Sequence, residues 1–233
     1  RLVMRGQAGV VQLVALVIGS ALSAVGVPAL VSVAVVAVIA GLVTVLSRAL
    51  RWHPPGALFA VFAAGATASI PASPGAVGHA ALLGSAAVAV ALIVTVLFAA
   101  VRGALSEPAD AVPPEAPSAQ TWSAAGLVTL GAAVAGVAAI WVTGEHWYWA
   151  MVAAVAAMSR PHLQAQMVRG AQRLVGTLVG ILIAAGLFAL DMPPLAIILV
   201  ALACQAGAEL FVGRNYAIAL LFITPLALLM VEL

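Results

Sequence analysis

Long apolar stretches, interrupted by prolines, arginines and small turn residues, follow one another along almost the whole chain. They lack the alternation of apolar and polar positions that is typical of strands, and most are long enough to cross a hydrocarbon core roughly 30 Å thick as a helix. Prolines lie at many of the breaks, where a missing N–H group does least damage to a helix. We therefore predict an all-α, polytopic transmembrane helix bundle of about nine spans. The predicted spans are 8–26, 28–47, 56–70, 76–101, 122–143, 146–158, 173–190, 194–212 and 215–231.

One hydrophilic connection, SEPADAVPPEAPSAQ at 106–120, separates two groups of these spans. It is rich in proline, alanine and acidic residues and has no apolar periodicity, which is typical of a flexible linker. We predict three parts: transmembrane helices over 1–105, a cytoplasmic Pro/acidic linker over 106–121, and further transmembrane helices over 122–233.

The composition excludes a water-soluble globular domain. Hydrophobic residues make up 65% of the chain and charged residues only 7%, against about 25% charged in soluble domains. Membrane topology explains the excess of arginine over acidic residues, and we expect no nucleic-acid partner. Cys204 is the single cysteine, so an intrachain disulfide is excluded. The absence of lysine and the abundance of Ala, Val and Gly indicate a bacterial, GC-rich genome.

Threading nine spans alternately through a bilayer places every arginine on one side. Positive residues concentrate on the cytoplasmic side of inner-membrane proteins, so we predict a bacterial inner (plasma) membrane protein with cytoplasmic arginine-rich loops. The arginines are Arg1, Arg5, Arg48, Arg51, Arg102, Arg160, Arg169, Arg173 and Arg214, with Glu145, Asp191 and Glu232 on the other side. Aromatic residues are expected to form interfacial belts, with Trp52, Trp122 and Tyr216 at inner ends and Trp141, Trp147, Tyr148 and Trp149 at outer ends. For the cluster Trp147–Trp149 the alternative to membrane anchoring is that the aromatic rings stack on a substrate.

Two parts of the chain share an internal repeat. Arg5-Gly6 corresponds to Arg169-Gly170, Pro28 to Pro193 and Arg48 to Arg214, with an offset that drifts only from 164 to 166. Such repeats are common in transporters. They predict a 6+6 helix architecture, with two helices missing upstream, one missing downstream, and 12 spans with cytoplasmic termini in the complete protein.

Two motifs resemble the fusaric-acid-resistance-like (FUSC) family, which includes bacterial aromatic carboxylic acid exporters. The first is HWYWAMVAAVAAMSRP at 146–161, and the second is RGAQRLVGTLVG at 169–180. The stretch ELFVGRNYAIALLFITPLALLM at 209–230 is similar to the family's later helices, so the resemblance covers about 85 residues. It implies export of small molecules across the inner membrane. Large cytoplasmic domains of some such exporters have no counterpart here.

Glu209 is an ionisable residue within an apolar span, and Arg214 follows five residues later. A carboxylate at the bilayer centre costs about 2.5–3.5 kcal/mol on insertion scales, so such a residue usually faces a bundle interior or a cavity. Glu209 is therefore a candidate proton carrier for export. The alternative is a structural pair between Glu209 and Arg214 near the cytoplasmic interface.

Arg169, Arg173 and Thr177 recur every four residues and so line one helical face. Arginine can hold a carboxylate through two hydrogen bonds, so this face is a candidate cationic vestibule for organic anions. Topology anchoring and lipid contact are the alternative for the arginines, and a hydroxyl bonded back to its own helix is the alternative for Thr177. Gly176 and Gly180 form a Gly-x-x-x-Gly strip suited to close helix approach.

The short span that contains Asn215, Tyr216, Thr224 and Pro225 corresponds in the repeat to the short span 56–70. Paired short or broken helices indicate a transport site. We place the substrate and proton pathway between these two spans and the Glu209 helix. Its candidate residues are Glu209, Arg214, Asn215, Tyr216, Thr224, Arg169, Arg173, Thr177 and Trp149.

Together these features favour a transporter that exports small amphipathic or aromatic organic acids, with proton coupling as one option. No cofactor, no metal and no enzymatic activity are expected, because the sequence has no phosphate-binding glycine loop, nucleophile elbow or clustered metal ligands. The expected partners are the lipid bilayer and a small organic anion, and homo-oligomerisation stays open. The alternatives are a non-transporting membrane scaffold that assembles with cell-envelope proteins and an intramembrane enzyme acting on lipid.

Overall fold

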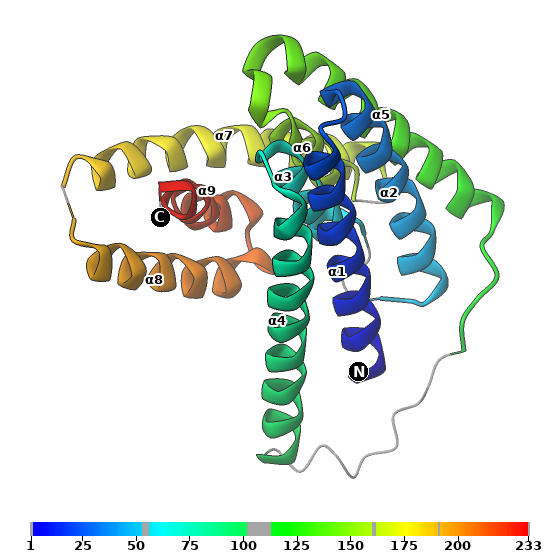
Figure 1. Ribbon diagram of the computed structural model, residues 1–233, viewed down its shortest axis with the longest axis horizontal. Helices are drawn as coiled ribbons and strands as arrows, with labels where there is room; N and C mark the ends of the chain where they lie inside the picture. The colour runs from blue at the N-terminus through cyan, green and yellow to red at the C-terminus, as the bar shows by residue number, and fades with distance from the viewer. Residues whose placement is uncertain (1, 53–55, 102–112, 160–161, 191, 233) are drawn as a thin grey trace. The chain divides into compact units, whose positions relative to one another are not determined.

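The computed structural model describes residues 2–52, 56–101, 113–159, 162–190 and 192–232, and their regular secondary structure is helical throughout (Figure 1). Arg1, Arg102, Arg160, Asp191 and linker residues 106–112, which enter the predictions above, lie outside the described residues. The elements are α1 (Leu2–Val25), α2 (Ala29–Ala49), α3 (Leu58–Ser69), α4 (Pro74–Val101), α5 (Ala119–Thr143), the short 3-10 helix η1 (Gly144–His146), α6 (Tyr148–Met158), α7 (Leu163–Phe188), α8 (Pro194–Val212) and α9 (Tyr216–Glu232).

All nine predicted spans coincide with α-helices, which confirms the all-α fold class. Six of these helices in the described part of the chain, α1, α2, α4, α5, α7 and α8, are long and apolar enough to cross a membrane. Helices α3 and α6 have 12 and 11 residues, which at 1.5 Å per residue is less than the roughly 30 Å of a hydrocarbon core. Nine full-length spanning helices are therefore not present. Helix α7 also begins at Leu163 instead of 173, so the arginines of its first turns are helical.

The chain divides into two compact units, Arg1–Ser159 with α1 to α6 and Arg160–Leu233 with α7 to α9. The predicted division at the linker 106–121 does not coincide with this boundary. The reason is tertiary packing, because α5 lies along α2 and α6 lies against α3. Hydropathy along the chain carries no information about such pairings.

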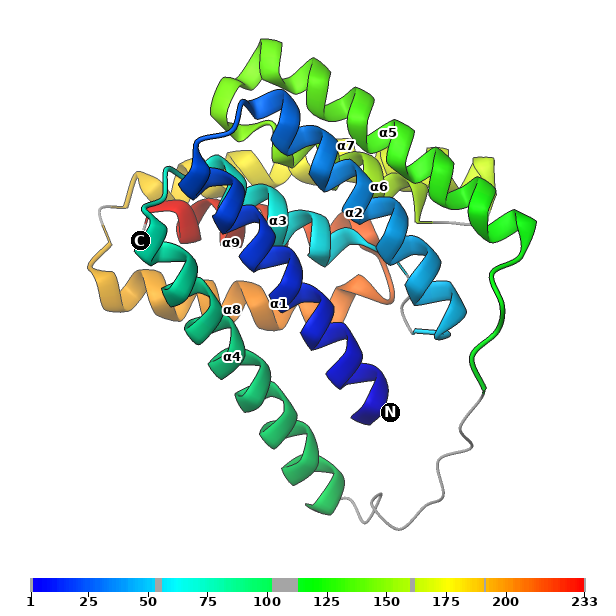
Figure 2. The same ribbon diagram turned by 45° about the vertical axis from the view of Figure 1, so that its right-hand side comes forward.

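In the first unit the two short helices α3 and α6 contribute much of the buried core. Val61 and Ala64 of α3, and Met151 of α6, are fully buried and belong to one cluster with residues of α1, α2 and α5. Helix α4 lies beside α1 (Figures 1 and 2) and buries none of its residues. The short helices are thus shielded by longer ones.

Three hydrogen bonds join α1 to the segment that holds α3. The indole Nε1 of Trp52 donates to Gln7 Oε1 at 3.2 Å, Thr67 Oγ1 donates to the Leu16 carbonyl at 3.1 Å, and Ser23 Oγ donates to the Ile70 carbonyl at 2.5 Å. These contacts show that Trp52, α3 and Ile70 follow one another in the same direction as α1. It covers the helix from Gln7 to Ser23, which is about 24 Å at 1.5 Å per residue.

In the second unit α9 packs along both α7 and α8. Two glycines of α7 allow the close approach, because a Cβ atom at Gly176 would lie 2.7 Å from Leu220 Cβ and one at Gly180 would lie 2.6 Å from Thr224 Cβ. On the other side, the ring of Phe222 stacks on Phe211 of α8 with centroids 5.8 Å apart. The glycine strip of α7 is thus a helix-packing surface, as the sequence predicts.

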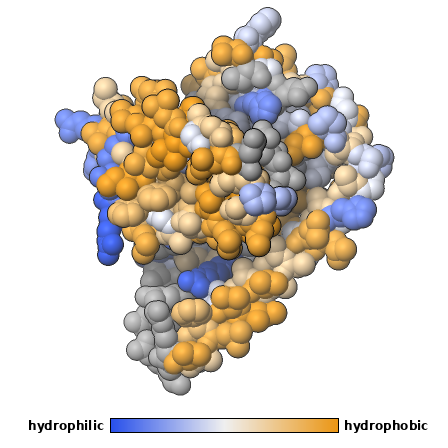
Figure 3. Space-filling model, turned by 90° about the vertical axis from the view of Figure 1, so that its left-hand side faces the viewer, coloured by the Kyte–Doolittle hydropathy of each residue, from blue (hydrophilic) through white to orange (hydrophobic). Residues whose placement is uncertain are grey.

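Large apolar side chains remain exposed along α4, α5, α7 and α8. Apolar side chains also predominate on the face drawn in Figure 3. In water such a surface would cost far more free energy than a soluble fold can offset. A hydrocarbon environment removes that cost, so these faces are suited to contact with lipid.

Candidate functional site

Two arginines of α7 converge on one tyrosine at the start of α9. Arg173 Nη1 donates a hydrogen bond of 2.8 Å to the hydroxyl oxygen of Tyr216. The guanidinium carbon of Arg169 lies 3.8 Å from the centroid of the Tyr216 ring. Because the two arginines are four residues apart on α7, both reach the same ring from one helical face. The predicted shared face is confirmed, and we call Arg169, Arg173 and Tyr216 the arginine–tyrosine cluster.

The cluster is partly enclosed by protein. Tyr216 is only 7% exposed and both arginines are half-buried. A shallow, open depression on α7 is lined by Gln164, Ala165, Val168, Arg169 and Gln172, which gives access to one side of the cluster. Two guanidinium groups beside an aromatic ring in a partly dehydrated place produce a positive potential that is screened less than at a fully exposed surface. The arrangement is therefore suited to an anion that also has an aromatic part.

Thr177 and Thr224 lie farther along the same pair of helices. Thr177 is half-buried and continues the face of Arg169 and Arg173 by one more turn. Thr224 packs against Gly180, so its position is fixed by the contact between α7 and α9. The described contacts give Thr224 a packing role and do not join either threonine to the arginine–tyrosine cluster.

Asn215 caps the first turn of α9. Its Oδ1 accepts hydrogen bonds from the backbone N–H groups of Ala217 at 3.1 Å and Ile218 at 3.3 Å. An asparagine in this position satisfies backbone donors that have no partner within the helix. The cap sets where α9 begins and so holds Tyr216 next to α7, while the neighbouring Arg214 is exposed.

Glu209 lies in the last turn of α8, and its side chain is exposed. Its Oε1 accepts a hydrogen bond of 3.1 Å from Gln205 Nε2, one turn earlier on the same helix. The described residues contain no ion pair between Glu209 and Arg214, so the alternative of a structural pair is not supported. The described contacts likewise do not bring Glu209 to the arginine–tyrosine cluster.

Trp149, the remaining predicted pathway residue, belongs to the first unit. Its ring packs against Phe62 of α3 at a centroid distance of 5.4 Å and against Tyr148 at 5.2 Å. Trp147 and Tyr148 are buried in the protein core. These two side chains therefore do not form part of an outer aromatic belt in contact with lipid. Trp52 and Tyr216 are also buried, so they do not form part of an inner one. Trp141 and Trp122 are 86% and 57% exposed, so their side chains are accessible for the contacts that an interfacial belt requires.

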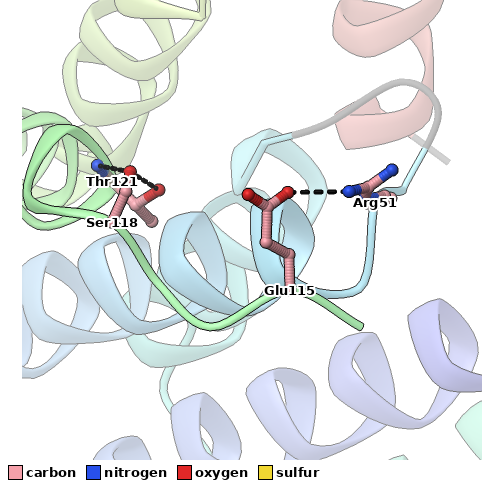
Figure 4. Close-up of polar contacts among 4 residues, drawn as sticks. All are labelled: Arg51, Glu115, Ser118 and Thr121. Atoms are coloured by element: carbon pink, nitrogen blue, oxygen red, sulfur yellow. Dashed lines mark hydrogen bonds and ion pairs between the residues drawn. The ribbon is translucent and has the colours of Figure 1, made fainter. Parts of the chain in front are cut away.

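Polar contacts that were not predicted from the sequence lie at the end of α2. Arg51 Nη2 donates to Glu115 Oε2 at 2.8 Å (Figure 4), and the backbone N–H of Glu115 donates to the Ala49 carbonyl at 3.0 Å. Ser118 caps α5 by accepting a hydrogen bond from the Thr121 N–H. The described end of the predicted flexible linker is thus attached to α2. In the sequence, only the opposite charges of Arg51 and Glu115 could have indicated this contact.

The first unit also holds a polar pair that the sequence analysis did not single out, between Gln7 and Trp52. Arg5 of α1 donates from Nη1 to Thr95 Oγ1 of α4 at 2.8 Å. No group of three His, Cys, Asp or Glu side chains suited to a metal ion lies within the described part of the chain.

These features define an all-helical, multi-pass membrane protein. Residues 130–233 match the family model described as fusaric acid resistance protein-like. The resemblance deduced from the motifs is thereby confirmed, and the family indicates membrane transport or efflux in general. The matched region includes all of α7, α8 and α9, and hence the arginine–tyrosine cluster. No curated protein and no solved structure matches the chain.

Proposed function

We propose that this protein exports small amphipathic or aromatic organic acids across a bacterial inner membrane. The observation that carries the proposal is the convergence of Arg169 and Arg173 on Tyr216 within the region that matches the family. A guanidinium group binds a carboxylate through two parallel hydrogen bonds and can also stack on an aromatic face. The cluster thus offers the two interactions that an aromatic carboxylate requires.

The proposed orientation places the arginine-rich ends in the cytoplasm. In the first unit the Gln7–Trp52 bond joins the start of α1 to the chain just after α2, so Arg5 and Arg51 lie at the same end of this unit. In the second unit Arg173 meets Tyr216, two residues after Arg214. This agreement within each unit supports the positive-inside assignment. The cluster would then receive substrate from the cytoplasm.

We propose in addition that proton uptake by Glu209 drives export. Its position in the last turn of α8 places it about 4.5 Å from the helix end at 1.5 Å per residue, close to where water meets the bilayer. Gln205 holds one carboxylate oxygen, so the side chain has a defined direction. A carboxyl group in such a place can exchange protons with the cytoplasm and with a path inside the membrane.

The direct test is uptake of radiolabelled benzoate into inverted inner-membrane vesicles that contain the full-length protein. Export in the cell corresponds to uptake in these vesicles, and a protonophore should abolish it. Glu209→Gln should abolish the response to a proton gradient, whereas Glu115→Gln, the same change at an exposed acid outside the cluster, should leave it intact. Verified, folded protein that accumulates no aromatic carboxylate with or without a gradient would contradict the exporter and favour the membrane scaffold.

A further inference from the structure

The Arg173–Tyr216 contact has a counterpart in the first unit. There, Trp52 Nε1 donates to Gln7 Oε1 at 3.2 Å, and in the second unit Arg173 Nη1 donates to Tyr216 at 2.8 Å. Trp52 and Tyr216 are separated by 164 residues and Gln7 and Arg173 by 166, and both separations lie within the 164–166 range of the sequence repeat. Each of the two aromatic side chains is 7% exposed. In each unit, therefore, a polar side chain from the first half of the first helix bonds to a buried aromatic residue that lies just after the second helix.

Helix α1 packs on α3 in the same manner as α7 packs on α9. A Cβ atom at Gly19 of α1 would meet the carbonyl of Ala64 and the hydroxyl of Thr67, both from α3. A Cβ atom at Gly180 of α7 would meet the carbonyl of Leu220 and the side chain of Thr224, both from α9. A glycine therefore faces a carbonyl and a nearby threonine in both units. The Gln7–Trp52 and Arg173–Tyr216 pairs thus lie beside similarly packed helices in the two units, and we call them the two clasps.

The two clasps differ in what they leave available for a ligand. An indole has one N–H donor and no acceptor, so the bond to Gln7 uses the whole polar capacity of Trp52. Arginine can only donate, so in the second clasp the phenol oxygen must be the acceptor, and its own proton must point elsewhere. Among the described residues, no hydrogen bond donated by the Tyr216 hydroxyl is found beside the one that it accepts from Arg173. Arg173 likewise has five N–H donors, and the bond to Tyr216 uses one of them.

We propose that the second clasp has become an oxyanion site, in which the Tyr216 hydroxyl and the remaining N–H groups of Arg173 bind one carboxylate together. This inference rests on the proposed function and names the atoms that recognise the substrate. Arg169 contributes positive charge from the face of the ring and holds the ring in place. The clasp of the first unit is structural and binds no anion, because neither of its side chains carries a positive charge.

The test compares benzoate binding by full-length variants in nanodiscs of zwitterionic lipid, measured by isothermal titration calorimetry. Tyr216→Phe keeps the ring beneath Arg169 and removes only the hydroxyl, and it should weaken binding about tenfold, as expected for a hydrogen bond to a charged group. Arg173→Gln with Tyr216→Trp reproduces the first clasp in the second unit and should abolish binding. Arg48→Gln removes the same charge as Arg173→Gln at a position outside the cluster, and it should bind benzoate as the wild type does.

Wild-type affinity in Tyr216→Phe would overturn the inference, even if the double variant failed to fold. The same measurement is repeated in nanodiscs that contain anionic phospholipid, because a lipid phosphate is an oxyanion like the benzoate carboxylate and could bind at the same place. If the second clasp binds carboxylate from solution, anionic lipid should at most compete with benzoate and so weaken its binding. A wild-type protein that binds no benzoate in zwitterionic nanodiscs would overturn the inference. Binding that depends on Tyr216 in a protein that transports nothing would refute the exporter and leave the oxyanion site standing.

Discussion

Arg173 Nη1 lies 2.8 Å from the hydroxyl oxygen of Tyr216, and this bond joins the first and the last helix of the second unit. The same ring carries the guanidinium group of Arg169 on its face. The position of one aromatic side chain therefore determines where two positive charges lie. Asn215 determines that position in turn, because it caps the helix that Tyr216 begins.

Removal of the stacked charge should weaken substrate binding without removing the site. We expect Arg169→Gln to raise KM for benzoate uptake into inverted vesicles about twofold to thirtyfold, since the contact between Arg169 and the Tyr216 ring, which holds that ring in place, contributes about 0.5–2 kcal/mol. The turnover rate should change little. Arg48→Gln removes one arginine elsewhere in the chain and serves as the control. An unchanged KM in Arg169→Gln would exclude Arg169 from the binding site.

The contact between α7 and α9 should not tolerate even one extra carbon atom. At Gly180 a Cβ would lie 2.6 Å from Thr224 Cβ and 3.0 Å from the Leu220 carbonyl oxygen. We expect Gly180→Ala to lower the free energy of unfolding by about 1–3 kcal/mol, as overpacking does elsewhere. Thermal unfolding of the full-length protein in detergent measures this change.

Gly186→Ala is the matched control, because the same substitution on the same helix meets no atom within 4 Å. Alanine is the better helix former, so this variant should be unchanged or slightly more stable. Equal destabilisation of the two variants would contradict the described packing of α9 on α7.

The Arg51–Glu115 ion pair should contribute little to stability. Its side chains are 45% and 66% exposed, so water and salt screen the attraction. We expect Glu115→Gln to lower the free energy of unfolding by at most about 1 kcal/mol, and by less at high salt. Chemical denaturation at two salt concentrations checks this expectation. A much larger loss would mean that the pair is far less hydrated than its exposure indicates.

The predicted topology can be checked by labelling single cysteines in a Cys204→Ser background. Ala116 lies next to Glu115 on the predicted cytoplasmic side, and Ser73 follows α3 on the predicted outer side; both are exposed. An impermeant maleimide should label Ala116→Cys in inverted vesicles and Ser73→Cys in right-side-out vesicles. Labelling of both positions from one side would show that α4, the helix between them, does not cross the bilayer.

The sequence by itself determined where the helices lie. The predicted span 194–212 has the bounds of α8, and the span 28–47 differs from α2 by at most two residues at each end. The physical reason is that the transfer of an apolar stretch into hydrocarbon depends on that stretch alone, and prolines interrupt helices locally. The four-residue spacing of Arg169 and Arg173 likewise predicted a shared face, because helical periodicity is a local property.

Only the tertiary structure decided which helices meet and which side chains are buried. Trp147 and Tyr148 have the sequence pattern of an interfacial belt, yet they pack into the core of the first unit. Glu209 has the pattern of a pair with Arg214, yet its carboxylate bonds to Gln205. The boundary between the units and the two clasps also depend on residues far apart in the chain. Apolar side chains suit a protein core and lipid equally well, so hydropathy cannot distinguish these environments, and only the packing of one helix on another can.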